Sequence, residues 1–545
     1  MKKLTALFLT LSFAAGVPAV SAQPATRSVY TAPKEAIDKL RDEGMNRSQV
    51  MQTLSYMTDV IGGRLTGSPN MKRANEWTRD KMKEWGMQNA HLESWGPFGR
   101  GWALRKYSAA VVEPQFIPVI AYPRAWSPAT KGVVSSEVVY LDAKTPEDLA
   151  KYKGQLKGKI VLASAERPLK PVDKPYVSRY DEEGLAKLAA APQPTDDGET
   201  IPVEALKNFT KSLNDSAKRL KFLIDEGAAV VINNSGAGSG GTIFVDGANV
   251  GVETPDIKTI EEFFESPAFQ PQSKKYEANM LPQLTMATED YNRLVRMIKQ
   301  GVKPKMTVEI DSQYYDEDPN GYNTIAEIPG TDPKLKDEVV MLGAHLDSWH
   351  SGTGATDNGA GSAAVMEAAR IIQASGLKPR RTIRVGLWSG EEQGLYGSTN
   401  YVRQHFGEKK NGTVVKGSDY DKLAAYYNLD NGTGRIRGVY MQGNSAVRPY
   451  FDAWLAPFAD AGAKTLTLSN TGGTDHLPFD AIGLPGFQFI QDAVEYGSRT
   501  HHSNQDNFDR IQVDDLKQAA TIIAAFAYQT AMMDEKLPRK SKPLP

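Results

Sequence analysis

The stretch from Met341 to Asp357 constrains the fold of this chain more than any other. An apolar run at residues 339–342 leads to His345 and Asp347, and a loop rich in Gly, Ser and Thr leads to Asp357. The residues that follow Asp357 have the spacing of a helix. This order predicts a buried strand, a loop and a helix. Because open α/β sheets bind ligands at the carboxyl ends of their strands, the stretch predicts part of a metal site.

Strand and helix patterns alternate from Tyr322 onwards, which predicts an α/β fold with a mostly parallel sheet covered by helices on both faces. The expected strands are residues 323–328, 339–343, 382–388, 424–429, 438–441 and 486–490. The expected helices are residues 359–375, 396–406, 446–461 and 513–533.

The middle of the chain has a different character and is interpreted as a β-rich domain inserted into the first one. Short β-like runs are broken by prolines, and residues 158–163 and 228–232 have the pattern of further strands. The Gly/Ser run at residues 236–241 lacks the Lys-Ser/Thr ending of a phosphate-binding loop, so a plain loop is expected. The predicted division is a signal peptide at 1–22, the N-terminal part of a peptidase domain at 23–115, the insertion at 116–310, the catalytic domain at 311–535 and a disordered tail at 536–545.

The N-terminus has the features of a secretory signal peptide. Lys2 and Lys3 are followed by an uncharged apolar run and by small residues up to Ala22, where cleavage is expected. The alternative is an N-terminal membrane anchor. No later stretch is long and apolar enough to span a bilayer. We therefore expect a secreted or periplasmic protein that is not bound to a membrane.

The composition restricts the kinds of site that the chain can build. The 545 residues have a formal net charge of -1, which gives no indication of nucleic-acid binding. Cysteine is absent, which excludes disulfides, thiolate metal sites and cysteine nucleophiles. Any metal must be held by His and carboxylates, and only seven His are present.

Four expected strand ends carry such residues. Parallel strands bring their carboxyl ends to one edge of a sheet, so these segments can meet although they are far apart in the sequence. Taken singly, each of these residues is more often a surface or turn residue, and only their joint occurrence favours a metal site. The residues are His345, Asp347 and Asp357 at the first strand, Glu391 and Glu392 at the second, Asp430 at the third, and His501 and His502 beyond the fourth.

The number of candidate ligands exceeds what one ion needs. A single catalytic zinc takes three protein ligands and a water, so five candidates suggest two metals that share a carboxylate. Asp357 could offer one oxygen to each ion. Of the adjacent pair Glu391 and Glu392, one could bind metal while the other stays free as a base. Zinc suits these ligands, with manganese or cobalt as alternatives.

These motifs together resemble the di-zinc exopeptidases that include secreted bacterial leucyl aminopeptidases and plasma glutamate carboxypeptidase (carboxypeptidase Q). The inserted region resembles a protease-associated domain. The matching segments are His345-Leu346-Asp347, Thr356–Gly361, Ser389–Gly394, Asn428-Leu429-Asp430, Gly473–Phe479 and His502–Asp506.

The resemblance implies a role for each residue. His345 and Asp430 would hold one zinc, Glu392 and His502 the other, and Asp357 would bridge them. Glu391 would be the general base, and Asp347 would accept the second ring N–H of His345. Many family members have Tyr at the position of His501, and this Tyr is thought to polarise the scissile carbonyl. The departure at His501 resembles the carboxypeptidase Q branch.

The expected activity is that of an aminopeptidase acting on peptides. Asp492 or Glu495 is the candidate for recognising the substrate amine. A carboxypeptidase or dipeptidase on the same scaffold is the nearest alternative, with Arg499 as the candidate for the substrate carboxylate. The remote alternative is a receptor-like binding protein without activity. The sequence indicates neither the preferred side chain nor the oligomeric state.

Overall fold

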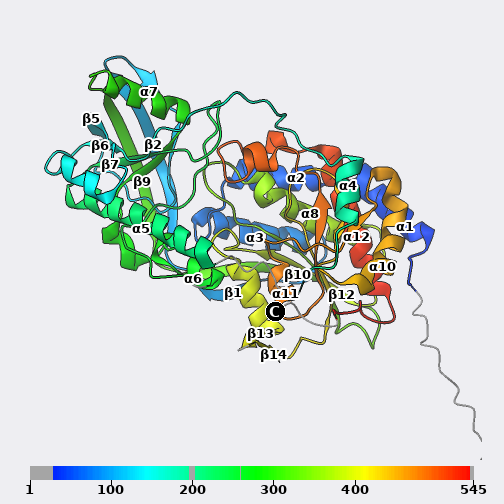
Figure 1. The fold of residues 1–545 in the computed structure, drawn as a ribbon. Coiled ribbons are helices and arrows are strands. Elements are labelled where there is room, and N and C mark those ends of the chain that lie inside the picture. Colours follow the sequence, from blue (N-terminus) through cyan, green and yellow to red (C-terminus); the bar gives the residue numbers. More distant parts are fainter. Residues whose placement is uncertain (1–28, 196–202, 258, 411, 541–545) are drawn as a thin grey trace, which may run out of the picture.

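The computed structural model describes residues 29–195, 203–257, 259–410 and 412–540. Two eight-stranded sheets organise this part of the chain. In Figure 1 one sheet lies on the left with α5 and α7, and the other lies on the right among most of the remaining helices. The predicted signal peptide falls outside the described residues.

The larger lobe is built on a sheet with the strand order β1-β10-β12-β11-β15-β18-β16-β17. Its four central strands, β12, β11, β15 and β18, run parallel. On one side β10 pairs antiparallel with both β12 and β1, and on the other side β16 pairs antiparallel with β18 and parallel with β17. The expected mostly parallel α/β sheet is therefore confirmed at its centre, and the edges carry the antiparallel strands that such sheets often have. The strands are β1 (Gln88–Pro97), β10 (Asn320–Ile328), β11 (Val339–His345), β12 (Thr382–Trp388), β15 (Leu423–Asn428), β16 (Ile436–Tyr440), β17 (Thr465–Thr467) and β18 (Gly486–Gln491).

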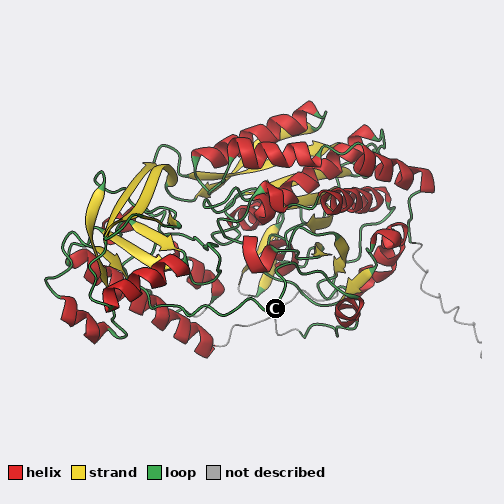
Figure 2. Ribbon diagram, turned by 90° about the horizontal axis from the view of Figure 1, so that it is seen from above, coloured by secondary structure: helices red, strands yellow, loops and turns green. Residues whose placement is uncertain are grey.

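Helices cover both faces of this sheet, as Figure 2 shows. Side chains of β11 alternate between the faces: Val340 and Leu342 pack in the core that contains α1, α8 and α12, whereas Met341 packs in the core that contains α9 and α11. The helices of this lobe are α1 (Lys34–Asn46), α2 (Val50–Ser55), α3 (Pro69–Glu84), α8 (Ala360–Ala374), α9 (Tyr396–His405), α10 (Arg448–Leu455), α11 (Leu477–Ala481) and α12 (Val513–Met532), with a small hairpin of β13 (Gly407–Lys410) and β14 (Thr413–Lys416).

The second sheet has the order β3-β2-β9-β5-β6-β7-β8-β4. On β6, Ile160 and Leu162 face the core under α7, while Val161 faces the core under α5. Its strands begin earlier and end later than the predicted insertion. The elements are β2 (Gly101–Glu113), β3 (Ile117–Pro118), β4 (Ala121–Pro123), β5 (Val134–Tyr140), β6 (Ile160–Leu162), α5 (Val203–Asp225), β7 (Val230–Asn234), α6 (Ile260–Phe264), β8 (Gln283–Met286), α7 (Thr288–Lys299) and β9 (Lys305–Tyr315).

One segment of the predicted insertion packs on the larger lobe instead of on the second sheet. Ser178 exchanges two backbone hydrogen bonds with Val494, of 2.8 and 2.7 Å. The helix α4 (Glu182–Ala189) follows and contacts β17 of the larger lobe. The two lobes are thus tied together by more than the chain crossings at β1 and β9.

Residues 536–540 differ from the expected disordered tail. Leu537 is buried in the main core, and Arg539 lies over the ring of Tyr420 with its Cζ 4.6 Å from the ring centroid. Packing of an apolar side chain and a cation–π contact hold this part of the C-terminus. Residues 541–545 lie outside the described residues.

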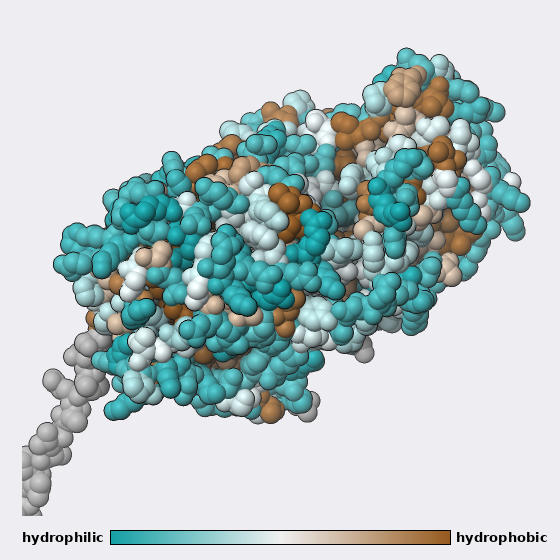
Figure 3. Space-filling view, turned by 180° about the vertical axis from the view of Figure 1, so that it is seen from behind, coloured by the Kyte–Doolittle hydropathy of each residue, from teal (hydrophilic) through white to brown (hydrophobic). Residues whose placement is uncertain are grey.

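Among the described residues, no helix combines the length and the apolar character needed to cross a bilayer. On the face drawn in Figure 3, hydrophilic residues dominate and the hydrophobic residues form small separate groups. Isolated apolar residues of this kind are normal on a protein surface.

The core between the sheet and α12 should depend strongly on Phe526. This fully buried ring lies 5.3–5.8 Å from the rings of Tyr427, Phe451, Trp454 and Phe489. We expect Phe526→Ala to lower the free energy of unfolding by about 3–5 kcal/mol, because it leaves a cavity in a close-packed core. Urea unfolding followed by tryptophan fluorescence measures the change.

The matched control is Val513→Ala at the exposed start of the same helix, where we expect a change within about 0.5 kcal/mol. Equal effects of the two substitutions would contradict the assignment of Phe526 to the core.

Candidate metal centre

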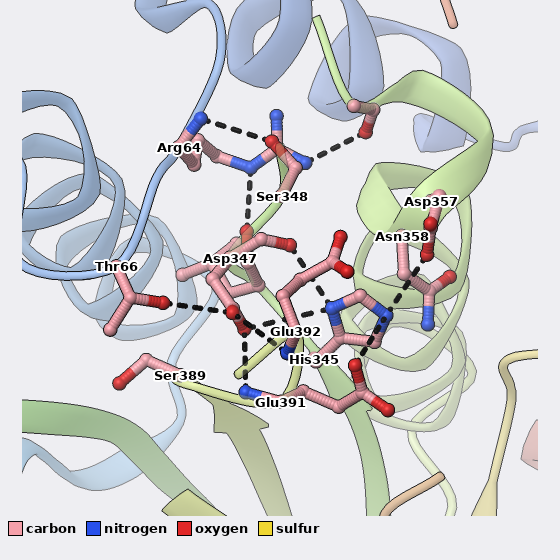
Figure 4. Close-up of polar contacts among 12 residues, drawn as sticks. Arg64, Thr66, His345, Asp347, Ser348, Asp357, Asn358, Ser389, Glu391 and Glu392 are labelled. Carbon is pink, nitrogen blue, oxygen red and sulfur yellow. Dashed lines mark hydrogen bonds and ion pairs between the residues drawn. The ribbon is translucent and has the colours of Figure 1, made fainter. Parts of the chain in front are cut away.

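The carboxyl ends of the central strands bring the predicted residues together. His345 is the last residue of β11, Glu391 and Glu392 follow β12, and Asp430 follows β15. Asp357 lies in the turn Ala355–Gly359 that precedes α8. Figure 4 shows how the side chains of His345, Asp357 and Glu391 converge.

One ring nitrogen of His345 is hydrogen-bonded, and the other has no hydrogen-bond partner among the described residues. Its Nδ1 lies 3.0 Å from the backbone oxygen of Asp347 and 3.6 Å from the carboxylate of that residue. Because a carbonyl oxygen only accepts, Nδ1 carries a proton, and Nε2 is the nitrogen that a metal could bind. The carboxylate of Asp347 was expected to fix this tautomer, and in the structure the nearer acceptor is its backbone carbonyl.

The carboxylate of Asp347 instead holds the loop that carries the two glutamates. It accepts hydrogen bonds from the backbone N–H groups of Glu391 and Glu392, at 3.4 and 3.3 Å, and from the Thr66 hydroxyl at 2.9 Å. These contacts set the direction in which both glutamate side chains leave the backbone.

Asp357 stands between two groups of candidate ligands. Its Oδ1 lies 3.2 Å from Nε2 of His345, and its Oδ2 lies 3.3 Å from Nε2 of His502. On the first side, Asp430 lies 3.6 Å and Glu391 3.9 Å from Nε2 of His345. On the second side, Glu392 lies 2.9 Å from Nε2 of His502. The two oxygens of Asp357 thus face two separate sets of ligands.

Arg64 holds the loops beneath these ligands. This fully buried side chain comes from the loop before α3 and donates to the backbone oxygens of Leu346, Thr353 and Gly354 at 2.6–2.7 Å. Burial lowers the pKa of Arg64 to about 10, although nearby carboxylates raise it. The guanidinium therefore stays charged and fixes the loop that follows β11.

Asp506 fixes the turn that carries Asp357. Its carboxylate accepts hydrogen bonds from the backbone N–H groups of Thr356 and Asp357, at 2.5 and 3.1 Å. Both N–H groups belong to the turn before α8, so Asp506 positions Asp357 through the backbone rather than through its side chain.

The electrostatics of the cluster favour a bound cation. Burial raises the pKa values of Glu392, Asp475 and Asp506 to about 7, and it raises the pKa of Glu391 well above its usual value. Burial lowers the pKa of His502, but the charges of Glu392 and Asp357 raise it to about 10. So many buried carboxylates repel one another, and positive charge among them would lower their free energy.

The donor atoms fit a metal. His345 Nε2, Asp357 Oδ2, Glu392 Oε1 and Asp430 Oδ1 are buried and lack a hydrogen-bond partner among the described residues. Buried polar atoms are normally paired, so unpaired ones that converge indicate a ligand. Sets of potential ligand atoms lie within 4.8 Å of one another, and they are His345 with Glu391 and Asp430, His345 with Asp357 and Glu392, and Asp357 with His501 and His502. Imidazole and carboxylate donors suit zinc.

Three residues that were predicted to contact substrate form ion pairs within the protein instead. Asp492 is buried, and its carboxylate accepts from the Tyr180 N–H at 2.9 Å and pairs with Arg437 and Arg179. Arg499 forms an ion pair with Glu495 at 3.0 Å, so both of these candidates already have a partner. These pairings argue against a substrate role for all three. His501 does lie at the centre, with Nε2 3.6 Å from Oδ2 of Asp357.

Besides Asp506, four residues of the site had no role in the sequence analysis. Arg64 and Thr66 come from a turn-rich loop whose sequence gives no sign of contact with β11. Asp475 is fully buried beside Ser398, in the Gly473–Phe479 motif. Tyr496 packs with its ring 4.7 Å from that of His501. The run Gly62–Gly67 was the one sequence feature that could have pointed to Arg64 and Thr66, because loops often carry functional residues.

Comparison with known proteins shows that the chain is similar to peptidases. Residues 323–527 match Peptidase family M28. Carboxypeptidase Q of Pongo abelii is 25% identical over 510 residues, which cover 93% of this chain and 90% of the relative. The resemblance drawn from the sequence motifs is confirmed.

Two solved structures share the fold. A peptidase M28 precursor from Shewanella amazonensis has a TM-score of 0.60 at 24% identity, and covers 94% of this chain and 98% of its own. BSAP, a zinc aminopeptidase from Bacillus subtilis, has a TM-score of 0.52 at 17% identity, and covers 91% and 98%. These similarities extend the agreement on the α/β fold to nearly the whole chain.

The role of Asp506 can be tested by its effect on metal binding. We expect Asp506→Ala to weaken zinc binding about 10- to 100-fold, because groups that orient ligands have effects of this size. Titration of the metal-free protein with zinc in the presence of a competing chelator measures the affinity. The control is Asp509→Ala, an exposed position nearby, which should bind zinc like the unchanged protein.

Proposed function

We propose that this chain, a metallo-exopeptidase whose residues 323–527 match Peptidase family M28, is an exported aminopeptidase that uses two zinc ions. The observation that carries the proposal is the position of Asp357, with one oxygen toward His345 and the other toward His502. The expected signal peptide supports export.

His345 and Asp430 would hold one zinc ion, and Glu392 and His502 the other, with Asp357 shared between them. Zinc supplies Lewis acidity, which lowers the pKa of a water molecule to about 7 and polarises a carbonyl group. The remaining residues of the centre orient these ligands, as described for Asp347, Arg64 and Asp506.

Glu391 would be the general base. Its carboxylate lies among the ligands, 3.9 Å from Nε2 of His345, and burial raises its pKa well above the usual value. A carboxylate whose pKa is raised is a stronger base than an ordinary one. Glu391 would take a proton from the attacking water and deliver it to the leaving amine.

His501 and Tyr496 are the candidates for stabilising the oxyanion of the scissile carbonyl. His501 is half-exposed at the rim of the centre, and burial lowers its pKa, so the ring is neutral at pH 7. A neutral ring can donate one hydrogen bond from the nitrogen that carries the proton. The hydroxyl of Tyr496 can also donate, and the neighbouring carboxylates keep it protonated, since burial and their charges raise its pKa well above the usual value.

A dipeptidase or carboxypeptidase activity on the same centre is the second candidate. The adjacent His501-His502 pair and the similarity to carboxypeptidase Q along 93% of this chain favour it. Amino-acid anilides, N-blocked dipeptides and unblocked dipeptides distinguish the two candidates. Hydrolysis of unblocked dipeptides alone would exclude a plain aminopeptidase.

Glu391→Gln tests the assignment of the base. We expect hydrolysis of a peptide to slow about 10²- to 10⁴-fold, because proton transfer by a positioned side chain contributes that much. The zinc content, measured by mass spectrometry of the metal, should stay unchanged. Glu408→Gln, in the exposed hairpin of β13, is the control. Activity at the level of the unchanged protein in Glu391→Gln would refute the role of Glu391.

The number of zinc ions bound by variants of the ligands distinguishes the shared ligand from those that serve one ion. We expect about two zinc ions in the unchanged protein, about one in Asp430→Ala and nearly none in Asp357→Ala, since only Asp357 serves both ions. Equilibrium dialysis followed by metal analysis measures the content. Two retained ions in Asp357→Ala would contradict the shared ligand, and a metal-free unchanged protein would contradict the proposed function.

A further inference from the structure

A polar cavity adjoins the metal centre on the side of the second sheet. Its volume is about 450 Å³, which suits part of a small ligand. His501 and His502 form one wall, and residues of the second sheet and its loops form the rest, among them Arg124, Asn233 and Asp246. The backbone of Val245 donates to the oxygen of His502 at 3.1 Å, so the two lobes are joined at this wall.

Arg124 is held firmly in this cavity while the end of its side chain stays unpaired. Its backbone N–H donates to the oxygen of Gln283 at 3.1 Å, and its Nε donates to the oxygen of Gly247 at 2.7 Å. Among the described residues, neither terminal nitrogen of the guanidinium has a hydrogen-bond or ion-pair partner. The two terminal N–H groups of a fixed guanidinium match the two oxygens of a carboxylate.

A second free donor lines the same cavity. The Oδ1 of Asn233 accepts from the hydroxyl of Ser164 at 3.1 Å, but its buried Nδ2 lacks a partner among the described residues. Buried amide groups are normally paired. Arg124 and Asn233 therefore present donors without acceptors, and a ligand with acceptor oxygens would satisfy both.

Asp246 is the opposing charge in the cavity. Its half-exposed carboxylate lies 3.8 Å from Nδ1 of His502, and it is not within ion-pair distance of Arg124. Burial lowers the pKa of Arg124 and the charge of Asp246 raises it. Arg124 is the only Arg or Lys among the described residues that line the cavity, so it is the one place there for an anion.

The charges at the two ends of the site differ in sign. The metal centre is rich in carboxylates, and Arg124 lines the adjoining cavity together with His501 and His502. From this we propose that Arg124, together with Asn233, binds the free α-carboxylate of the leaving residue. This inference rests on the proposed function and narrows its substrates to short peptides with a free C-terminus, of which dipeptides are the simplest.

The pair leucyl-alanine and leucyl-alaninamide tests the inference, since only the first has a carboxylate. We expect the unchanged zinc-loaded protein to hydrolyse leucyl-alanine with the lower KM. Arg124→Gln should raise the KM for leucyl-alanine about 10- to 100-fold, the effect of losing a charge-assisted hydrogen-bonded pair, and leave the amide unaffected. Arg124→Lys should recover part of the loss. The matched control is Arg105→Gln on the exposed side of β2.

Binding is measured separately by calorimetry with Glu391→Gln as the background, so that leucyl-alanine is not consumed. Weaker binding in the double variant with Arg124→Gln supports the inference even if hydrolysis has another mechanism. Equal binding and equal KM values for acid and amide in both proteins would overturn it, while normal hydrolysis of leucine anilide would leave the proposed function standing. Failure to hydrolyse any peptide or anilide, with the binding difference intact, would remove the proposed function alone.

Discussion

The burial of several carboxylates at one sheet edge is the constraint on which the rest of the structure depends. A buried carboxylate without a partner is costly. Here Asp357, Glu391 and Asp430 lie within 4 Å of His345, and Glu392 lies 2.9 Å from His502. Cations among the carboxylates would lower the free energy of this arrangement. The zinc ions of the proposed function would therefore be structural as well as catalytic.

The loops around the centre are fixed by groups that come from distant parts of the sequence. Arg64 binds carbonyl oxygens of the loop after β11, Asp347 binds the amides after β12, and Asp506 binds the amides of the turn before α8. Each contact restrains a backbone segment rather than a ligand atom. Such supports leave the ligand side chains few alternative orientations, which is what a site needs in order to bind a metal tightly.

The second sheet is part of the site and not only an appendage. Its loop at Val245 pairs with the backbone of His502, and its residue Arg124 faces the cavity beside His501 and His502. A lobe in this position can select among substrates without touching the reacting bond. Substitution of Arg124 or Asn233 would then change the substrate specificity and leave the metal centre intact.

The sequence by itself determined the central sheet, the helices on both faces and the residues of the centre, because these follow from local patterns. Apolar runs, helical spacing and the position of a polar residue at a strand end all lie within a few residues of one another. The order of the strands, the antiparallel edges and the packing of residues 536–540 were decided by tertiary contacts. The same is true of Arg64, Asp475 and Arg124, which lie far along the chain from the residues that they adjoin.

Asp492 and Arg499 show the converse, since both looked suited to a substrate and both are paired with other side chains of the protein. Whether a charged side chain is free depends on its neighbours in space, and no local pattern records them.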